Sequence, residues 1–225
     1  MSHELRTPLN AVLGFAQMLQ MDNRNPLTTD QLSHLDAIIR GGNHLLGLVN
    51  DILDLAKIEA NQISLSYEEI DVAQAVAECI RLLISTAEGR SIRLVNEVPA
   101  DCELKVWGDG RRFNQALLNL ISNGIRYNEH GSAVSVSVES QDEDFVRILV
   151  ADTGIGIAEH DHHGVFQMFN RLSEGPMLSS EGTGIGLTVT KLLVERMNGR
   201  IGFESEKGAG SVFWIDLPSG PKANA

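Results

Sequence analysis

Asp152-Thr153-Gly154-Ile155-Gly156-Ile157 and Glu181-Gly182-Thr183-Gly184-Ile185-Gly186-Leu187 are two glycine clusters that lie about one loop apart in the chain. Glycine has no Cβ, so the backbone N–H groups of such turns can approach an anion closely. The second cluster leads directly into residues 187–194, whose apolar spacing predicts a helix. Free N–H groups and the helix dipole both favour negative charge at a helix N-terminus. Either cluster alone could be an ordinary turn, but together they predict a nucleotide phosphate site.

The composition is that of an ordinary soluble globular protein. The chain has 225 residues, of which 43% are hydrophobic and 21% charged, and this length suits one large domain or two small ones. No apolar run approaches the roughly 20 residues that span a bilayer. We therefore expect a cytoplasmic location, with any membrane attachment in a part of the protein upstream. The formal net charge of −12 argues against broad binding of nucleic acid or an anionic membrane.

The N-terminal part of the sequence predicts a helical hairpin. Apolar residues recur at helical spacing from residue 3 to about residue 22, and again along a longer helix that runs from 28 to about 60. Thr28 and Gln31 have the spacing of a capping box. Two helices cannot bury so wide an apolar stripe alone, so we expect a four-helix bundle formed with a second copy. Because the first helix is shorter than its partner, we also expect it to continue upstream in the whole protein.

After a polar linker at 61–66, the pattern changes to that of a mixed α/β domain. The fold class that we predict is therefore α+β, with the hairpin at 1–60, a two-layer α/β sandwich at 67–218 and a tail at 219–225. The expected strands are 63–70, 92–98, 104–107, 133–138, 145–150, 200–205 and 211–217, and the expected helices are 71–87, with Asp71 as N-cap, 111–127 and 183–198.

The helix predicted at 111–127 carries Asn119 and Asn123 one turn apart on one face. Asparagine is a poor residue for a helix interior, so the pair is either solvated and capping or holds a ligand. The amide oxygen of Asn123 could bind Mg²⁺, the usual companion of a triphosphate. Arg126 could pair with a phosphate and Tyr127 could lie along a base, although both could equally be ordinary surface residues.

Five segments, in the right order, resemble the signature boxes of sensor histidine kinases and cover essentially the whole chain. No single box is specific, but the set is. Residues 2–10 (SHELRTPLN) resemble the H box, 118–127 (LNLISNGIRY) the N box, 152–156 (DTGIG) the G1 box, 165–171 (VFQMFNR) the F box and 182–187 (GTGIGL) the G2 box. The resemblance implies a HisKA-type dimerisation and phosphoacceptor domain followed by a GHKL (Bergerat) ATPase domain.

The resemblance also implies an ATP pocket. A carboxylate at Asp152 would accept a hydrogen bond from the adenine amino group, and Asn123 would bind Mg²⁺. A segment at about 159–181 would be a mobile lid, with Phe166 and Phe169 either as its apolar latch or as buried core. The other positions implied to bind the nucleotide are Asn119, Arg126, Tyr127, Gly154, Gly156, Ile157, Phe169, Arg171, Gly182, Thr183, Gly184, Gly186 and Leu187.

His3 is the residue that the resemblance implies is phosphorylated, although a lone histidine is more often structural. Glu4 could accept the Nδ1 proton of His3, which leaves Nε2 as the nucleophile toward the γ-phosphorus of ATP. Thr7, one turn on, would orient a water for the reverse loss of phosphate. The implied reaction continues with transfer to an aspartate of a response regulator receiver domain, and a phosphatase reaction toward that regulator is also expected. The implied partners are this receiver domain and a second copy in a homodimer.

Two other functions stay open. GHKL ATPases of the gyrase and mismatch-repair kind place a glutamate four residues before the Mg²⁺-binding asparagine, as general base for water. Asn119 stands at that position and cannot take a proton, which disfavours hydrolysis. A scaffold that binds ATP without turnover is the second alternative, and the intact boxes argue against it.

Some residues depart from the family pattern. Arg126 stands where lysine is usual, Gly124 where alanine is usual, and Asn128 where serine or threonine is common. Arginine still reaches phosphate, as a planar fork in place of a point charge. The cluster His160-Asp161-His162-His163 suggests a metal, but adjacent ligands rarely converge on one ion, so we expect a solvated loop there.

Overall fold

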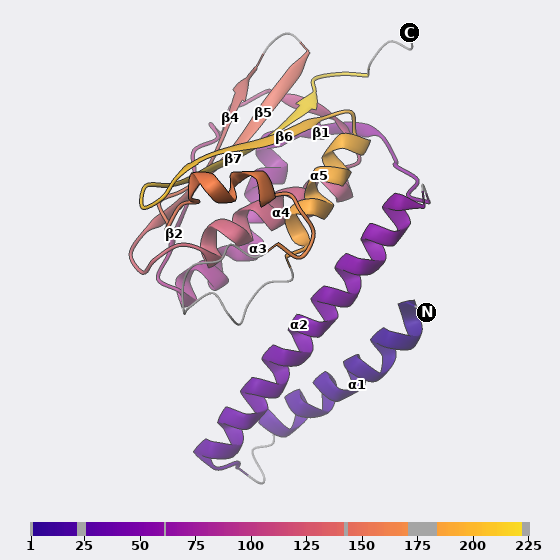
Figure 1. Cartoon of the computed structure of the whole chain (residues 1–225), viewed down its shortest axis with the longest axis vertical. Coiled ribbons are helices and arrows are strands. Elements are labelled where there is room, and N and C mark those ends of the chain that lie inside the picture. The colour runs from indigo at the N-terminus through magenta and orange to yellow at the C-terminus, as the bar shows by residue number, and fades with distance from the viewer. Residues whose placement is uncertain (1, 22–25, 61, 142–143, 171–183, 222–225) are drawn as a thin grey trace.

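The chain folds into a helical hairpin joined to an α/β sandwich (Figure 1), which confirms the predicted fold class. The computed structural model describes residues 2–21, 26–60, 62–141, 144–170 and 184–221. Within these ranges, no helix is both long enough and apolar enough to cross a membrane.

The hairpin consists of α1 (Ser2–Gln20) and α2 (Thr29–Glu59). The predicted capping box is confirmed, because Gln31 N donates to Thr28 Oγ1 at 3.3 Å and Thr28 N donates to Gln31 Oε1 at 2.9 Å. Gly42 of α2 lies against Leu13 of α1, so closely that a Cβ there would be 2.6 Å from the leucine side chain. This glycine weakens the helix intrinsically, but it lets the two helices approach each other.

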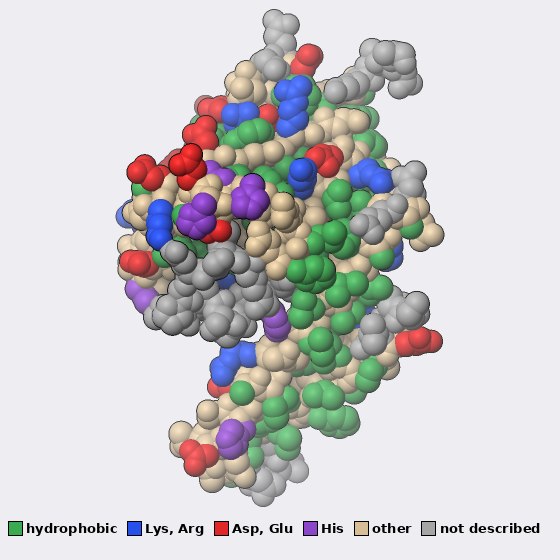
Figure 2. All heavy atoms as spheres, viewed as in Figure 1, with side chains coloured by type: hydrophobic (Ala, Val, Ile, Leu, Met, Phe, Trp, Pro, Cys, Tyr) green, Lys and Arg blue, Asp and Glu red, His purple; other side chains and the backbone are tan. Residues whose placement is uncertain are grey.

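Much of the apolar surface of the hairpin is uncovered within this chain. Figure 2 shows hydrophobic side chains along both helices. Large exposed apolar patches are typical of interaction surfaces, and the expected four-helix bundle would use this one. The exposed large apolar residues of the hairpin are Val12, Phe15, Met18, Leu19, Met21, Leu32, Ile38, Leu45 and Ile52.

The sandwich places helices against a sheet of mixed strands. The five-stranded sheet has the order β2-β4-β5-β7-β6, in which β2 is parallel to β4 and the other pairs are antiparallel. A separate antiparallel pair joins β1 to β3. The elements are β1 (Glu68–Asp71), α3 (Val72–Gly89), β2 (Arg93–Asn96), β3 (Lys105–Gly108), α4 (Gly110–Arg126), β4 (Ala133–Ser140), β5 (Phe145–Asp152), the 3-10 helix η1 (Glu159–Gly164), α5 (Gly186–Arg196), β6 (Arg200–Glu206) and β7 (Gly210–Pro218).

The expected elements of the sandwich are present, with two corrections. The strand predicted at 63–70 is confined to Glu68–Asp71, because residues 62–67 pass from α2 to the sandwich without strand pairing. The second is η1, which stands where a loop was expected. Asp71 caps α3 as predicted, since Gln74 N donates to its Oδ1 at 2.8 Å.

Helix α4 forms the centre of the core. Its apolar face is fully buried against the sheet, whereas its opposite face is polar. The core residues of α4 and their main partners in β4, β5 and β7 are Phe113, Leu117, Leu120, Ile121, Val134, Val136, Ile148, Val150 and Ile215.

The sandwich is docked on the C-terminal half of α2 by an apolar contact. Ile58 is only 1% exposed and packs in one cluster with Ile185, Val189 and Leu193 at the start and along the length of α5. Beside it, Arg196 Nη2 donates to the backbone oxygen of Ile58 at 2.7 Å.

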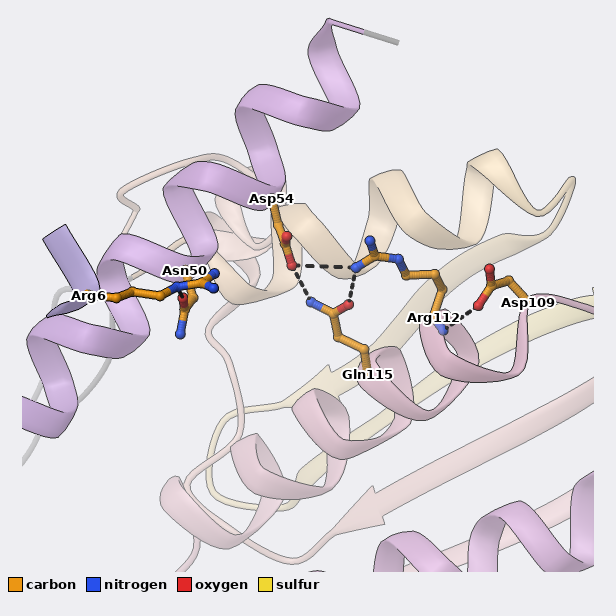
Figure 3. A network of polar contacts seen from close by, with 6 residues as sticks. All are labelled: Arg6, Asn50, Asp54, Asp109, Arg112 and Gln115. Atoms are coloured by element: carbon orange, nitrogen blue, oxygen red, sulfur yellow. Dashed lines mark hydrogen bonds and ion pairs between the residues drawn. The ribbon is translucent and has the colours of Figure 1, made fainter. Parts of the chain in front are cut away.

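A polar contact joins α2 to α4 one turn away (Figure 3). Gln115 Nε2 donates to Asp54 Oδ2 at 2.9 Å, and Arg112 Nη1 lies 3.6 Å from the same oxygen. Arg112 Nη1 also donates to Gln115 Oε1 at 2.8 Å. Arg112 and Gln115 of α4 therefore both contact the carboxylate of Asp54. On the hairpin side, Arg6 Nε donates to Asn50 Oδ1 at 2.9 Å, which ties α1 to α2 close to this contact.

Asp109→Ala tests how strongly the entry into the sandwich is held. Asp109 is 9% exposed, and it accepts one hydrogen bond from Arg112 N, as the N-cap of α4, and another from Ser66 N. Losing both should lower the free energy of unfolding by about 2–3 kcal/mol. The matched control, Asp71→Ala, removes an exposed N-cap and should cost about 1 kcal/mol. Thermal unfolding measures both, at about 2–4 °C per kcal/mol, and equal losses would contradict the role of Ser66.

Candidate functional site

A cavity of about 310 Å³ lies between the sandwich and α2. The polar face of α4, the end of β5 with the glycine turn that follows it, the start of α5 and the first residues of β7 form its sides. Gly156 of the first glycine cluster therefore meets Gly184 and Gly186 of the second at one cavity, as the sequence predicts.

Asp152 lies at the end of β5, opposite Ser211 of β7 in the strand register. Its Oδ1 accepts a hydrogen bond from Gly154 N at 2.9 Å. Burial raises the pKa of Asp152 above its ordinary value of 3.8, while the backbone N–H groups of Gly154 and Ser211 act in the opposite direction. The result is a fixed, largely desolvated acceptor, which suits recognition of a ring amino group.

The glycines of the turns are required by their backbone conformation. Gly156 and Gly184 have φ of +62° and +67°, in the left-handed region that side chains disfavour. A Cβ on Gly156 would also collide with the carbonyl oxygen of Glu206, at the turn between β6 and β7. The glycine spacing therefore reflects close backbone approach around the cavity.

Asn119 and Asn123 both reach the cavity from α4. Asn119 Nδ2 donates to the buried Thr190 Oγ1 of α5 at 2.7 Å, and its Oδ1 would be 2.6 Å from a Cβ on Gly186. Asn119 is thus a link between α4 and α5 as well as a lining residue. Gly124 also lines the cavity, and there a Cβ would be 3.1 Å from the side chain of Val134 in β4.

Most of the predicted nucleotide residues come together here. Gly154 is buried beside the cavity and binds Asp152, without lining the cavity itself. Arg171, Gly182 and Thr183 lie outside the described residues. The predicted residues that line the cavity are Asn119, Asn123, Arg126, Tyr127, Asp152, Gly156, Ile157, Gly184, Gly186 and Leu187.

The region predicted as a lid is only partly described, and its first part is packed. His162 Nε2 lies 3.1 Å from the backbone oxygen of Ile157, and its ring meets Phe203 edge to face at 5.1 Å. Phe166 is half-buried against the same Phe203 at 5.8 Å. In contrast, Phe169 is 65% exposed and does not line the cavity, although its N–H donates to the oxygen of Gly184 at 3.0 Å.

The histidine cluster forms no metal site in the described ranges, where no group of three or more His, Cys, Asp or Glu residues could hold an ion. His160 Nε2 lies 3.5 Å from Asp161 Oδ2, and the ring of His162 contacts that of Phe203. The cluster forms the 3-10 helix η1 and not the loop that was expected.

A magnesium ion bound with a nucleotide does not need such a group, because Mg²⁺ usually keeps several waters and takes one or two protein ligands plus phosphate oxygens. The amide oxygen of Asn123 is a hard donor in the cavity, so the residues present fit that ion.

His3, Glu4 and Thr7 stand apart from this cavity. They belong to the first two turns of α1, and the described lining of the cavity includes no residue of α1. Glu4 and Thr7 are exposed, and the side chain of His3 lies outside the described part of the chain. In Figure 1, α1 lies on the side of α2 that faces away from the sandwich.

Other lining residues were missed by the sequence analysis. Ser211 and Phe213 occupy alternate positions of β7, a signal that the strand pattern contained, but only the pairing with β5 places them beside Asp152. The polar face of α2 gave no signal, because the helical pattern there predicted only packing. The lining residues of α2 are Asn43, His44, Gly47 and Asp51.

Comparison with known proteins agrees with this architecture. Residues 1–61 match the His Kinase A (phospho-acceptor) domain, and residues 108–221 match the histidine kinase-, DNA gyrase B-, and HSP90-like ATPase family. The chain is 39% identical over 220 residues to the sensor histidine kinase GacS of Pseudomonas protegens and 35% identical over 221 residues to the signal transduction histidine-protein kinase BarA of Escherichia coli K12. Each alignment covers 96% of this chain but only 24% of the relative, so the chain spans about a quarter of their length.

Solved structures show the same arrangement. Full-length ShkA in complex with AMPPNP superposes with a TM-score of 0.76 at 33% identity, over 96% of this chain and 44% of that one. The histidine kinase AdeS of Acinetobacter baumannii gives a TM-score of 0.66 at 25% identity, over 97% of this chain and 98% of that one. This chain therefore belongs to the sensor histidine kinases, and it carries both the phospho-acceptor helices and the ATPase domain of their catalytic core.

Proposed function

We propose that the chain binds ATP with Mg²⁺ in the cavity, phosphorylates His3 and passes the phosphoryl group to an aspartate of a response regulator. The observation that carries this proposal is the convergence of Asp152, Asn123 and the glycine turns on one cavity large enough for a nucleotide. The similarity to ShkA, which was solved with the ATP analogue AMPPNP, supports the same ligand.

Each residue has a defined task in this proposal. Asp152 accepts a hydrogen bond from the adenine amino group, Asn123 offers its amide oxygen to the magnesium ion, and Arg126 binds phosphate. When bound, the ion supplies charge neutralisation at the phosphates. The Nε2 of His3 attacks the γ-phosphorus, the bond to the bridging oxygen breaks, and ADP leaves. Glu4 takes the Nδ1 proton, so the phosphorylated imidazole forms without a positive charge.

The polar contacts of Asn119 favour transfer over hydrolysis. A general base for water must accept a proton, and an amide cannot. The Nδ2 of Asn119 is already bound to Thr190. Thr7, exposed on α1, is the residue we assign to the opposing dephosphorylation, where it orients water near the regulator.

We also infer that a second copy covers the apolar surface of the hairpin and completes a four-helix bundle. The exposed apolar residues of α1 and α2 lie on the domain that matches the phospho-acceptor family. Burial of such a surface is the main driving force for association of this kind.

His3→Gln tests the phosphorylation site directly. The variant should bind ATP with unchanged affinity, because His3 is on α1 and the cavity is formed elsewhere, but it should carry no acid-labile phosphate after incubation with γ-labelled ATP. Labelling followed by acid treatment, together with calorimetry, measures both properties. Acid-labile phosphate on the variant would place the reaction on another histidine, and an acid-stable product on the native chain would reject histidine chemistry.

Asp152→Asn tests the adenine assignment, and the pKa of Asp152 predicts its effect on stability. Because burial raises that pKa in the folded state, ionisation of Asp152 costs folding free energy at neutral pH, and this cost disappears as the pH falls through the raised pKa. The neutral amide removes the cost, so the melting temperature at pH 7 should not fall. ATP affinity should fall at least about tenfold. Unchanged affinity in a folded variant would refute the pocket assignment.

Phe15→Glu tests the dimer surface. The side chain of Phe15 is 66% exposed on α1, and a charge there should prevent its burial against a second copy. We expect the variant to sediment as a monomer at concentrations where the native chain dimerises. Leu82→Glu is the matched control, since Leu82 is 65% exposed on α3 of the sandwich and should leave the dimer intact. Dissociation by both variants, or by neither, would contradict the assignment of this surface.

A further inference from the structure

One wall of the cavity comes from the helical hairpin. Asn43, His44, Gly47 and Asp51 of α2 line it together with the ATPase residues. Gly47 follows Asn43 and His44 by four and three residues and precedes Asp51 by four, which places them on one face of the helix. Because α2 belongs to the part that matches the phospho-acceptor family, the cavity is formed by two domains.

The contact between Asp54 and Gln115 fixes one point at which α2 meets α4 beside the cavity. From Gln115, the next turns of α4 bring Asn119 and Asn123 to the cavity, about 6 and 12 Å further along the helix at 1.5 Å per residue. From Asp54, the turns of α2 bring Asp51 and then Gly47 to the same cavity. Starting from this one contact, α2 and α4 therefore both line the cavity.

The chemistry of the wall differs along its length. Of the lining residues of α2, Asp51 is the nearest in the chain to Asp54, which contacts Gln115. Asp51 is a carboxylate, so it disfavours a phosphate in its part of the cavity. Further along, Gly47 leaves space, and Asn43 and His44 offer N–H donors. On α4, Arg126 lines the cavity beyond Asn123. Donors from both helices thus lie at the end that is far from Asp51.

We propose that α2 is part of the nucleotide site, with His44 donating to the polyphosphate of the bound nucleotide and Gly47 leaving the space that the phosphates take. This inference rests on the proposed function, because it assumes that the cavity binds ATP. Binding of ATP and docking of the sandwich on α2 are then linked, so docking raises the affinity for ATP by the same factor by which bound ATP favours docking.

Substituting the glycines of α2 tests the wall by filling it. A Cβ on Gly47 or on Gly41 meets nothing within 4 Å, so neither backbone resists a side chain, and leucine favours the helix at both positions. Only Gly47 lines the cavity. Gly47→Leu should lower ATP affinity in calorimetry by at least about tenfold, which is about 1.4 kcal/mol, whereas Gly41→Leu should bind as the native chain does.

Substitutions of two histidines of α2 test where the phosphates bind. His44→Ala should lower affinity for ATP by about tenfold and leave affinity for adenosine unchanged, because adenosine has no phosphate. His34→Ala removes an exposed histidine from the same helix, outside the cavity lining, and should change neither affinity. An equal loss for ATP and adenosine in His44→Ala would overturn the phosphate assignment.

Asp54→Ala separates docking from direct contact. Asp54 does not line the cavity, but it holds α2 against α4, so its loss should weaken ATP binding severalfold. If the native chain binds ATP while Gly47→Leu and Asp54→Ala bind equally well, the inference fails and the proposed function stands. If the native chain binds no ATP, the proposed function itself fails.

Discussion

The structure depends on the two faces of α4. One face must pack without gaps against the sheet, which Phe113, Leu117 and Ile121 achieve at zero exposure. The other face must stay polar because it forms one side of a cavity and the docking contact with α2. Large-to-small changes on the buried face cost about 2–5 kcal/mol, so the helix cannot rotate to relieve a poor contact on its polar face. The amides of Asn119 and Asn123 are therefore positioned by the core behind them.

Because of this constraint, α4 alone provides both a side of the cavity and the polar contact with α2. Gln115, Asn119 and Asn123 follow one another at four-residue spacing, and they contact α2, α5 and the cavity in turn. The amide group of Asn119 fixes α5 through Thr190. In the proposed reaction, the same amide cannot act as a general base for water.

Local patterns in the sequence were sufficient for most of the elements and for most of the predicted residues that line the cavity. The capping box at Thr28, the N-cap Asp71 and the glycine turns each depend on neighbours within a few residues, so their signals are local. The strand expected at 63–70 was too long because apolar alternation continues where no partner strand exists. The packed start of the predicted lid was missed because it depends on Phe203, about forty residues further along the chain.

The wall from α2 could not be predicted from the sequence for the same reason. His44 and Gly47 reach the cavity only because Ile58 and Asp54 dock on helices of another domain, and no pattern within α2 encodes that partner. The domain bounds and the roles of His3, Glu4 and Thr7 stay predictions.

The position of α2 has a consequence for catalysis. In Figure 1, α2 passes between the sandwich and the N-terminal turn of α1, so within one chain a helix about 10 Å wide separates the sandwich from the turn that carries His3. Burial of an isoleucine such as Ile58 contributes about 1.5–3 kcal/mol, and a pair such as Asp54 with Arg112 adds little more. Contacts that contribute a few kcal/mol leave an undocked minor state accessible. For the proposed transfer to His3, the docked arrangement is thus a resting geometry, and the reacting one would be reached either by its release or across a pair of chains.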